Sequence, residues 1–469
     1  MDKHRKPIVE ALQQFQQHDP ISFHVPGHKN GMLSTLPNSY KDALRFDMTE
    51  LKTLDDLHYP EECIAEAQAL LTNTYNADAS FFLVNGSTIG NLAMIYATCK
   101  AGDVVLVQRN AHKSIFHGLE LVGATAVLLA PQWDESTKTA SYVALHTLKQ
   151  AIAGYPNARA VIITSPTYYG VISPELEQFI SYAHMQHIPV LVDEAHGAHF
   201  QAHAELPTSA LQLGADVVVQ SAHKTLNAMT MASFLHVRSD IIASTAVAKY
   251  LRMLQSSSPS YMLLASLDDA RHFVATYTDQ DYAYMMQQRE TFIMALKDIQ
   301  HVTPIAVHDP LKLVIRIEGY DGFTIKEALE QQHVFVELAD NEQVLLVLPL
   351  LKKSQQYRYD EAIEAITRAV QALLLKPYTY KELPYYNYTA PVTEVLMTEA
   401  TRELVYFEAA INRKSAENIV PYPPGIPLLV RGECITATHI EAILQYDALR
   451  CPIQGEHHIA TKQLYVMKE

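Results

Sequence analysis

Short runs of β-branched and other aliphatic residues alternate with helical patterns over residues 61–270, and this alternation restricts the fold more than any other feature. Strands separated by helices are typical of βαβ units, in which the strands form a mainly parallel sheet with helices on both faces. The sequence therefore predicts an α/β fold. Its expected strands are Val104–Val107, Val127–Leu129, Val161–Thr164, Val190–Val192 and Val217–Val219.

The chain has 469 residues, more than one compact core usually holds, and its pattern changes along its length. Two strand-like runs around a helical pattern in residues 271–376 predict a smaller α+β domain. The prolines and tyrosines from Pro377 to Pro391 are typical of a linker. The expected parts are an N-terminal arm (1–60, with a short helix over Ile8–Phe15), the large α/β domain (61–270), the small α+β domain (271–376), and the linker with a C-terminal domain (377–469).

A lysine stands directly after one of the expected strands. The run Val217–Val219 gives way to Ser221, His223 and Lys224. An amine at a strand end, beside groups able to bind a phosphate, suits a Schiff base with pyridoxal 5'-phosphate. An exposed turn lysine is the ordinary alternative for an isolated Ser-x-His-Lys pattern. The residues at the other strand ends favour the catalytic interpretation.

An aspartate, Asp193, ends the run Val190–Val192 on the preceding strand. In open α/β sheets, ligands bind beyond the carboxyl ends of the strands. A carboxylate in that position can pair with the protonated pyridine nitrogen of the cofactor and keep its ring electron-poor. A helix N-cap is the common structural alternative for an aspartate after a strand. Together with Lys224, the catalytic role is favoured.

Two further strand ends carry complementary groups. Gly86 allows close approach of the backbone to an anion, and Ser87 and Thr88 offer hydroxyl and N–H groups at a helix start. Gly-Ser-Thr alone also fits a helix cap. His112 follows the run Val104–Val107 and could stack on an aromatic cofactor ring, although a lone histidine is more often structural. Four strand ends with complementary roles predict one cofactor site.

These segments together resemble the Orn/Lys/Arg decarboxylases, a family of pyridoxal-phosphate enzymes of basic amino acids, and the resemblance runs almost end to end. It implies the fold-type I PLP-dependent transferase-like fold, in a short form without the receiver-like N-terminal domain of longer members. The matching segments are Phe23–Gly31, Asp47–Leu51, Leu54–Leu57, Asn85–Thr88, Arg109–Ser114, Asp193–His199, Ser221–Leu226, Pro421–Pro427 and Gly432–Glu433.

The resemblance implies a role for each matching residue. Lys224 would form the Schiff base, Asp193 would pair with the pyridine nitrogen, and His112 and Ala195 would lie against opposite faces of the ring. The site would lie at the interface of a homodimer. The residues implied for the phosphate are Ser87, Thr88, Ser221 and His223, with Ser257 and Ser258 reaching the neighbouring subunit's phosphate.

The expected reaction is loss of CO2 from a basic amino acid, because the cofactor ring can delocalise the electrons left at Cα. A proton must then return to Cα. Lys224, His223 and His196 are the candidate donors, and the sequence does not rank them.

The substrate's distal cation requires an acidic partner. Glu337, Asp340 and Glu433 are the candidates, the last by resemblance, and each could instead be a solvated surface acid. Short forms resemble biosynthetic arginine or lysine decarboxylases, so conversion of arginine to agmatine, in polyamine biosynthesis, is expected first, with lysine and ornithine next. The sequence departs from the family pattern at Glu61 and Glu62, where relatives usually carry glycine.

Two other classes of function are found with the same fold and cofactor. An aminotransferase or β-eliminase would release a keto acid instead of an amine. A non-catalytic protein that binds pyridoxal phosphate would have no need for Lys224, Asp193 and His112 together. One fold hosts many reactions, so the fold alone does not decide between these classes.

Charge and composition exclude several partners. The net charge of −15 disfavours nucleic acid, whose phosphates it would repel. No apolar stretch reaches the roughly 20 residues that span a bilayer, and the N-terminus lacks the apolar core of a secretory signal. The four cysteines show no paired metal-ligand spacing, so we predict no metal site and reduced thiols in the cytoplasm.

Overall fold

The computed structural model describes residues 2–374, 392–396, 401–422, 425–449 and 451–468. Contacts divide the chain into two compact units, Met1–Thr98 with Leu191–Asp279 and Cys99–Val190 with Gln280–Glu469. The chain leaves the first unit after Thr98 and returns to it at Leu191, and the four expected parts stay a prediction. The expected linker, 377–391, lies outside the described residues.

The first unit is built on four neighbouring strands, β1 (Ala79–Leu83), β9 (Ser233–Val237), β8 (Val217–Gln220) and β7 (Val190–Asp193). β7 and β8 are parallel, whereas β9 is antiparallel to both β8 and β1. Every residue of β7 and β8 is buried, as continuous apolar runs predict. The strands predicted to end at Asp193, before Ser221 and before Gly86 are confirmed, and β9 is an additional one.

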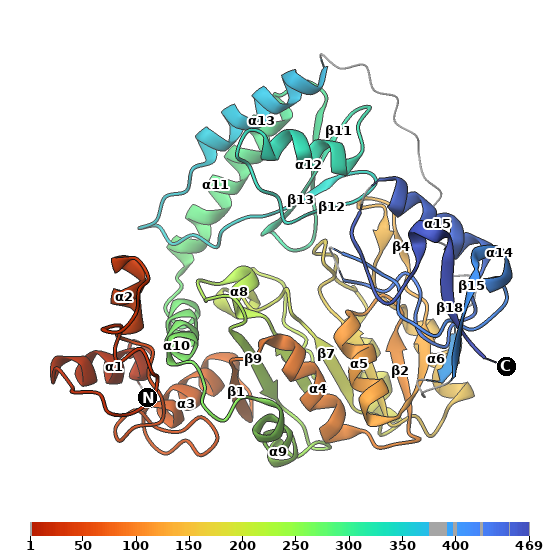
Figure 1. The fold of residues 1–469 in the computed structure, drawn as a ribbon. Coiled ribbons are helices and arrows are strands. Elements are labelled where there is room, and N and C mark those ends of the chain that lie inside the picture. The colour runs from red at the N-terminus through yellow and green to blue at the C-terminus, as the bar shows by residue number, and fades with distance from the viewer. Residues whose placement is uncertain (1, 375–391, 397–400, 423–424, 450, 469) are drawn as a thin grey trace. The chain divides into compact units, whose positions relative to one another are not determined.

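Helices pack on these strands, and a glycine sets one close contact. A Cβ added to Gly90 would come within 2.7 Å of Val219, so α4 (Gly86–Thr98) lies directly against β8. α4 and α9 (Ser244–Leu254) lie side by side (Figure 1). The predicted N-terminal helix is confirmed as α1 (Pro7–Gln17). The other helices of this unit are α2 (Asn38–Leu44), α3 (Cys63–Tyr75), η1 (Phe200–Ala202), α8 (Ala222–Thr225) and α10 (Tyr261–Ala275).

The turn with Glu61 and Glu62 is organised by an aspartate. The Asp55 carboxylate accepts the N–H groups of Glu61 and Glu62 at 2.9 and 2.8 Å, and it also accepts those of Ile64 and Ala65 at the start of α3. A carboxylate at a helix N-terminus is favourable for both hydrogen bonding and the helix dipole. Glu62 has φ −123°, outside the left-handed region, so its backbone conformation does not require glycine.

The second unit has its own parallel strands, β6 (Ala160–Thr164), β2 (Val104–Gln108) and β3 (Thr125–Leu129), with β14 (Val392–Leu396) antiparallel to β3. The three strands predicted here are confirmed. The helices that follow or precede them are α5 (Lys113–Val122), α6 (Leu145–Gly154) and α7 (Leu176–Met185), and a short hairpin joins β4 (Trp133–Asp134) to β5 (Thr139–Ala140).

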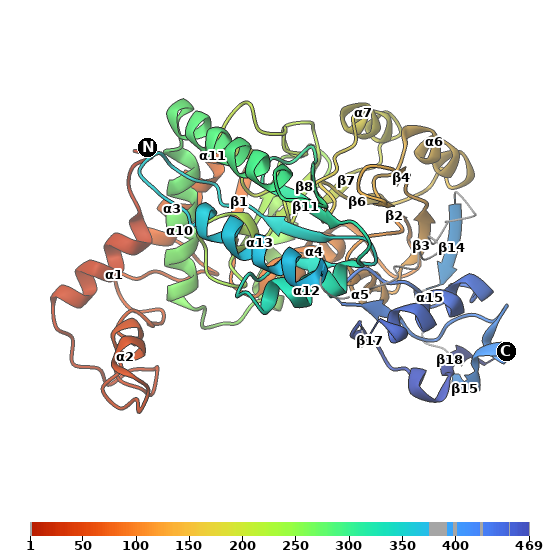
Figure 2. The ribbon, with the colours of Figure 1, turned by 90° about the horizontal axis from the view of Figure 1, so that it is seen from above.

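A second sheet of this unit is antiparallel throughout, in the order β10 (Val302–Ala306), β11 (Lys312–Ile317), β13 (Val344–Val347) and β12 (Leu338–Ala339). α12 (Gly322–Glu330) contacts β12 and β13, and α12 and α13 (Tyr359–Leu374) lie side by side (Figure 2). α11 (Asp279–Lys297) precedes this sheet. The strands and the helix expected in this part of the chain are thus confirmed.

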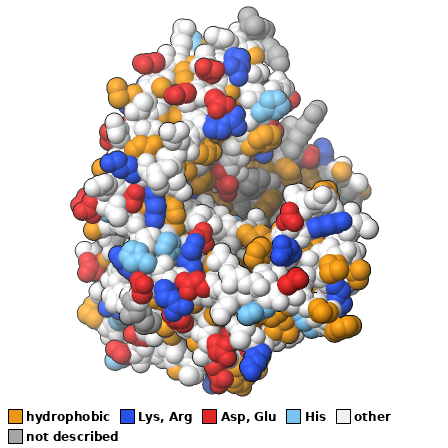
Figure 3. Space-filling model, turned by 90° about the vertical axis from the view of Figure 1, so that its left-hand side faces the viewer, with side chains coloured by type: hydrophobic (Ala, Val, Ile, Leu, Met, Phe, Trp, Pro, Cys, Tyr) orange, Lys and Arg blue, Asp and Glu red, His pale blue; other side chains and the backbone are white. Residues whose placement is uncertain are grey.

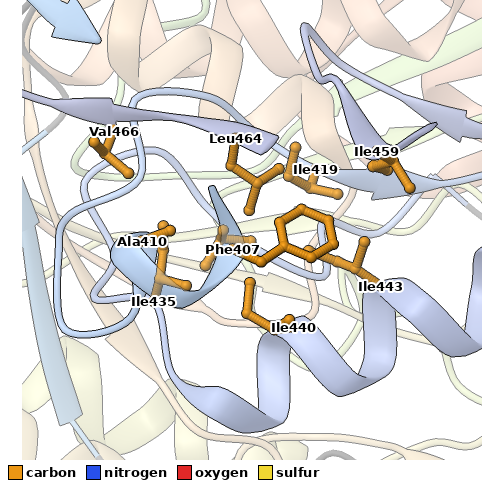
Figure 4. Close-up of a cluster of buried hydrophobic side chains, with 10 residues drawn as sticks. Phe407, Ala410, Ile419, Ile435, Ile440, Ile443, Ile459, Leu464 and Val466 are labelled. Atoms are coloured by element: carbon orange, nitrogen blue, oxygen red, sulfur yellow. The ribbon is translucent and has the colours of Figure 1, made fainter. Parts of the chain in front are cut away.

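The C-terminal segment has a small apolar core of its own. Phe407, Ile419, Ile440 and Leu464 point toward one another within it (Figure 4). Thr436 and His439 form a capping box at the start of α15. The elements are β15 (Arg402–Tyr406), α14 (Phe407–Ala410), β16 (Val420–Pro421), α15 (Ala437–Ala448), β17 (Ile453–Gln454), η2 (Ile459–Thr461) and β18 (Gln463–Met467).

Charged side chains of both signs are interspersed on the face drawn in Figure 3. The negative net charge is therefore not gathered into one acidic patch on that face. Among the residues that the structure describes, no helix combines the length and the apolar composition needed to cross a membrane.

Candidate active site

The carboxyl ends of three strands meet at one edge of the first unit. β7 and β8 are parallel, and β1 runs the same way because both β1 and β8 are antiparallel to β9. Asp193 is the last residue of β7, Ser221 to Lys224 follow β8, and Gly86 to Thr88 come shortly after β1. Strand direction alone therefore brings together most of the predicted cofactor residues.

Asp193 is buried, with 2% of its surface exposed, and its carboxylate is held from two sides. Nδ2 of Asn91 donates to Oδ2 at 2.9 Å, and the N–H of Ala195 donates to Oδ1 at 3.2 Å. Burial raises the pKa of Asp193, while the charge of Lys224 and the two hydrogen bonds act in the opposite direction. The carboxylate is thus fixed in orientation and coupled electrostatically to the lysine.

The amine of Lys224 lies against an imidazole. Its Nζ is 3.0 Å from Nε2 of His196, and that histidine is 2% exposed. This distance allows a proton to be shared between the two nitrogens, with Nε2 accepting from the ammonium when the imidazole is neutral. Two of the three candidate proton donors are therefore in direct contact.

Hydroxyl and backbone groups surround a space suited to an anion at the start of α4. Oγ of Ser221 donates to Oγ of Ser87 at 2.8 Å, and the N–H of Ser221 donates to the carbonyl of Ala195 at 3.2 Å. Gly86 has φ +80°, and nothing lies within 4 Å of a Cβ added there. An open glycine, two hydroxyls and a helix N-terminus fit a phosphate group. The side chain of Thr88, which was also predicted to bind the phosphate, is exposed.

The remaining predicted phosphate residues lie in the same unit. The N–H of Ser256 donates to Oδ1 of Asn85 at 3.3 Å, so the segment that contains Ser257 and Ser258 adjoins the residue before Gly86. Ser258 is exposed. Nδ1 of His223 is 3.1 Å from the carbonyl of Ala232. The roles of Ser257, Ser258 and His223 at a phosphate stay predictions.

Beside Asp193 stands a second buried carboxyl, Glu194. It accepts from Oγ of Ser209 and the N–H of Ala210, each at 2.7 Å, and from Nε2 of Gln220 at 2.6 Å. Burial raises its pKa to about 7, against the lowering effect of these hydrogen bonds. His236, which burial keeps neutral by lowering its pKa to about 3, lies 3.2 Å from the same Gln220.

Glu194 should make stability depend on pH. Its pKa rises from an ordinary 4.5 to about 7 on folding, so the folded chain binds more protons between these values. The free energy of unfolding should therefore fall as pH rises through this window, by about 3 kcal/mol for this group. Urea unfolding from pH 4.5 to 8 should show a smaller decrease in Glu194→Gln. The exposed Glu205 provides the control, and a Glu205→Gln curve that matched Glu194→Gln would contradict this assignment.

His112 lies in the second unit, where it caps α5. Its Nδ1 accepts the N–H of Ser114 at 3.3 Å and is 2.8 Å from the Oγ of the same residue. A Cβ added to Gly425 would lie 3.2 Å from Nε2, and Gly425 has φ +90°. Glycine at 425 therefore lets the backbone at that position approach the imidazole. Stacking of His112 on a cofactor ring stays a prediction.

Glu433, predicted for the substrate, has a partner in the protein. Nε and Nη2 of Arg109 donate to its two carboxylate oxygens at 2.9 and 2.7 Å, and the N–H of Val430 donates at 3.0 Å. Burial alone would raise the pKa of Glu433, but Arg109 and the Val430 N–H outweigh it and the pKa is lowered. Arg109 also donates to the carbonyls of Pro427 and Leu428, so the pair holds the end of the motif 421–427.

Breaking this buried pair should cost stability. Glu433→Ala leaves the Arg109 guanidinium buried without its carboxylate, so the free energy of unfolding should fall by about 3 kcal/mol in chemical denaturation. Replacing both residues with leucine should recover most of this loss, because no charge is then left buried. Glu361→Ala, which breaks the exposed pair with Arg358, should leave the unfolding midpoint in place. Equal losses for the two single variants would show that Glu433 is not a stabilising partner.

The other two predicted substrate acids, Glu337 and Asp340, have surroundings that differ from those of Glu433. Glu337 is exposed beside β12. Asp340 accepts the hydroxyl of Tyr169, Nε2 of Gln343 at 3.0 Å, and the N–H groups of Glu342 and Gln343. Burial raises the pKa of Asp340 against these hydrogen bonds. A substrate role for Glu337, Asp340 or Glu433 stays a prediction.

Sequence reasoning missed three sets of contacts made by the predicted residues and their neighbours. Asn91 stands four residues after Ser87, on the same face of α4, and this spacing was the available signal. Glu194 sits next to Asp193 but points into a different network. The pairing of Arg109 with Glu433 spans 324 residues and had no local signal.

Comparison with solved structures shows the class of fold first. Lysine decarboxylase A from Pseudomonas aeruginosa superposes with a TM-score of 0.80 at 19% identity, covering 98% of this chain and 80% of that one. A Sphingomonas wittichii serine palmitoyltransferase gives a TM-score of 0.55 at 14% identity, with 79% of this chain and 85% of that one covered. At these identities the likeness shows the fold alone, and it confirms the predicted fold-type I α/β fold.

The sequence comparisons then show the family. The family model of the Orn/Lys/Arg decarboxylase major domain matches residues 6–310, and that of the C-terminal domain matches residues 374–452. The chain belongs to the Orn/Lys/Arg decarboxylase family and is a decarboxylase. An arginine decarboxylase of Bacillus subtilis is 31% identical over 100% of this chain and 99% of that protein. The uncharacterized protein YaaO of the same organism is 43% identical over 99% of this chain and 98% of its own length.

Proposed function

We propose that this protein is a pyridoxal-phosphate-dependent decarboxylase of a basic amino acid, with arginine as substrate and agmatine as product. The observation that carries the proposal is the grouping of Lys224, His196 and Asp193 beside the hydroxyls of Ser87 and Ser221 at one edge of the first unit. The cytoplasmic location and the place in polyamine biosynthesis expected from the sequence are parts of the same proposal.

The described residues fit this cofactor. The open Gly86 and the hydroxyls of Ser87 and Ser221 would hold the phosphate of the cofactor. The amine of Lys224 would bind the aldehyde carbon of the cofactor. The fixed carboxylate of Asp193 would accept the pyridine N–H. When bound, the cofactor supplies a ring that accepts the electrons of a breaking bond at Cα. Asp193, held by Asn91 and Ala195, would keep its charge directed at one ring atom.

Proton transfer is assigned to the contact between Lys224 and His196. After CO2 leaves, a proton must reach Cα of the substrate, and an amine paired with an imidazole can deliver one and be reprotonated. Nζ of Lys224 and Nε2 of His196 are already 3.0 Å apart. His223 has its Nδ1 directed at the Ala232 carbonyl, which makes it the less suitable donor of the three.

The proposal of arginine rests on relatives over the whole chain. Besides the Bacillus subtilis protein, the arginine decarboxylase of Halalkalibacterium halodurans is 32% identical over 99% of this chain and 98% of its own length. The lysine decarboxylase LdcA of Pseudomonas aeruginosa is 28% identical over 56% of this chain. Arginine is therefore tested first, with lysine and ornithine beside it.

The experiment is product analysis by mass spectrometry. The cofactor-loaded protein is incubated separately with arginine, lysine and ornithine, and the products agmatine, cadaverine and putrescine are measured. Agmatine formed faster than the other two amines supports the proposal. A different preferred amine would correct the substrate, whereas a keto acid, or no amine from any of the three, would overturn the decarboxylation of basic amino acids.

We also propose that the protein acts as a homodimer. Ile21, Phe23 and Met32 expose 85%, 94% and 84% of their surface, with Val25 and Leu33 exposed nearby. Exposed apolar residues gathered in one segment are typical of an interaction site. Sedimentation of the wild type should give a dimer, and Phe23→Ser with Met32→Ser should shift it toward monomer. Tyr357→Ser, at another exposed aromatic, should leave the dimer intact.

A further inference from the structure

A line of buried polar side chains crosses the four strands of the first unit. Oγ of Ser80 in β1 lies 2.8 Å from Nδ1 of His236 in β9, and Nε2 of that histidine is 3.2 Å from Oε1 of Gln220 in β8. Nε2 of Gln220 donates at 2.6 Å to Glu194, which directly follows β7. All four residues are buried. The line therefore joins β1, β8 and β7, the three strands whose ends carry the predicted cofactor residues.

The hydrogen bonds in this line all point toward Glu194. The carboxylate orients the Gln220 amide, because the reverse orientation would set an oxygen against it. Oε1 of Gln220 therefore accepts from Nε2 of His236, whose ring is neutral because burial lowers its pKa to about 3. A neutral imidazole with its proton on Nε2 accepts at Nδ1, here from the hydroxyl of Ser80. Glu194 is thus the acceptor at which the line ends.

The same network holds the loop that follows β7, residues 194–198. A Cβ added to Gly197 would lie 2.6 Å from Cγ of Glu194, so the loop packs directly on that side chain. At the other end of the loop, Oη of Tyr75 donates to the carbonyl of Ala198 at 2.8 Å. The ring of Tyr75 in turn stacks on His236, with the ring centroids 4.3 Å apart. The loop is therefore anchored at both ends by one connected set of contacts.

The contacts of the candidate site are made between these two anchors. The N–H of Ala195 donates to the Asp193 carboxylate at 3.2 Å, and the carbonyl of Ala195 accepts the N–H of Ser221 at 3.2 Å. The next residue, His196, places Nε2 at 3.0 Å from Nζ of Lys224. Each of these contacts depends on the path of the loop, because the atoms that make them belong to the loop backbone or to the histidine that it carries.

We propose that Glu194 and Gln220 are positioning residues of the cofactor site. Their side-chain hydrogen bond fixes the loop after β7 against the end of β8. This link sets the direction of the Asp193 carboxylate and the contact of His196 with Lys224. The inference rests on the cofactor roles proposed above for Asp193 and Lys224. It requires the hydrogen-bonded link between the two side chains and not the charge of Glu194.

Two substitutions of Glu194 separate the link from the charge. Methionine is as long as glutamate but offers no comparable acceptor, so Glu194→Met should lower kcat about 10- to 100-fold with little change in KM. It should also raise the Kd of pyridoxal 5'-phosphate about tenfold. Glutamine can accept the N–H of Ala210 and donate to Oε1 of Gln220, while the line of donors reverses through His236 to Ser80. Glu194→Gln should therefore keep kcat and the cofactor Kd close to those of the wild type.

A substitution on the other side of the link should have the same effect. Gln220→Met leaves Glu194 its contacts with Ser209 and Ala210, yet it should reproduce the losses of Glu194→Met. The double variant should lower kcat no further than either single one, because both changes break one link. Asp216→Asn, at a buried aspartate directly before β8, is the control. It should lower the melting temperature and retain kcat and the cofactor Kd.

Cofactor titration, steady-state kinetics and melting curves are measured for each variant below its melting temperature. If Glu194→Met and Gln220→Met melt earlier but keep kcat and the cofactor Kd, the pair only supports the fold and the proposal is overturned. Equal losses in Glu194→Gln and Glu194→Met would assign the effect to the charge and overturn it as well. If Glu194→Met does not fold, Gln220→Met decides the result. Titration needs no turnover, so a wild type that binds the cofactor without forming an amine would refute the decarboxylation alone.

Discussion

Lys224→Ala should reduce formation of the product amine by at least about 10⁴-fold, because no other group in the described site can take the place of its amine at the cofactor. The variant should also lose the absorption band of covalently held cofactor, which is read separately from turnover. The measurement is amine production by mass spectrometry beside a visible spectrum of the purified protein.

The control for this variant is Lys249→Ala, at an exposed lysine of α9 in the same unit. It should retain both activity and the absorption band. Amine production by Lys224→Ala at a rate near that of the wild type would show that the reaction does not run through this lysine. Loss of the band with retained turnover would point to a catalyst other than the covalently held cofactor.

Asp193→Asn should lower kcat by roughly 10³-fold while weakening cofactor binding far less. The substitution keeps the shape of the side chain and its contact with Asn91, but it removes the charge that the ring nitrogen would face. Steady-state kinetics and cofactor titration measure the two effects independently. A residue that only supported the fold would change both together.

The matched control is Asp216→Asn, a buried aspartate at the other end of β8, where Oδ1 accepts the hydroxyl of Ser239. Its effect should be on stability, with kcat close to that of the wild type. A kcat for Asp193→Asn that equalled the control would remove Asp193 from the catalytic machinery.

The strand ends were predictable because their signal is local. A buried parallel strand needs a continuous apolar run, so the point where Val217–Gln220 gives way to Ser221 marks the sheet edge without any knowledge of the fold. The same holds for Val190–Asp193. The helix at the N-terminus and the strands of the second sheet were also predictable from local patterns of apolar residues.

The contacts of the candidate site were predictable only in part. That Lys224 and Asp193 lie near one another followed from their positions at the ends of neighbouring strands, whereas the contact of Lys224 with His196 depends on how the loop after β7 turns. The substrate acids show the limit most clearly. The sequence predicted that Glu433 is available to a ligand, whereas in the folded chain Arg109 is its ion-pair partner.

The sequence by itself determined the class of fold, the strand ends where the predicted site residues lie, and the family, since each of these depends on residue type and short spacing. The tertiary structure decided which side chains meet. It joined Asn91 to Asp193, buried Glu194 in its own network, and paired Arg109 with Glu433. The physical reason is that a hydrogen bond or ion pair requires two groups within about 3 Å. Over long separations in the sequence, only the path of the folded chain sets that distance.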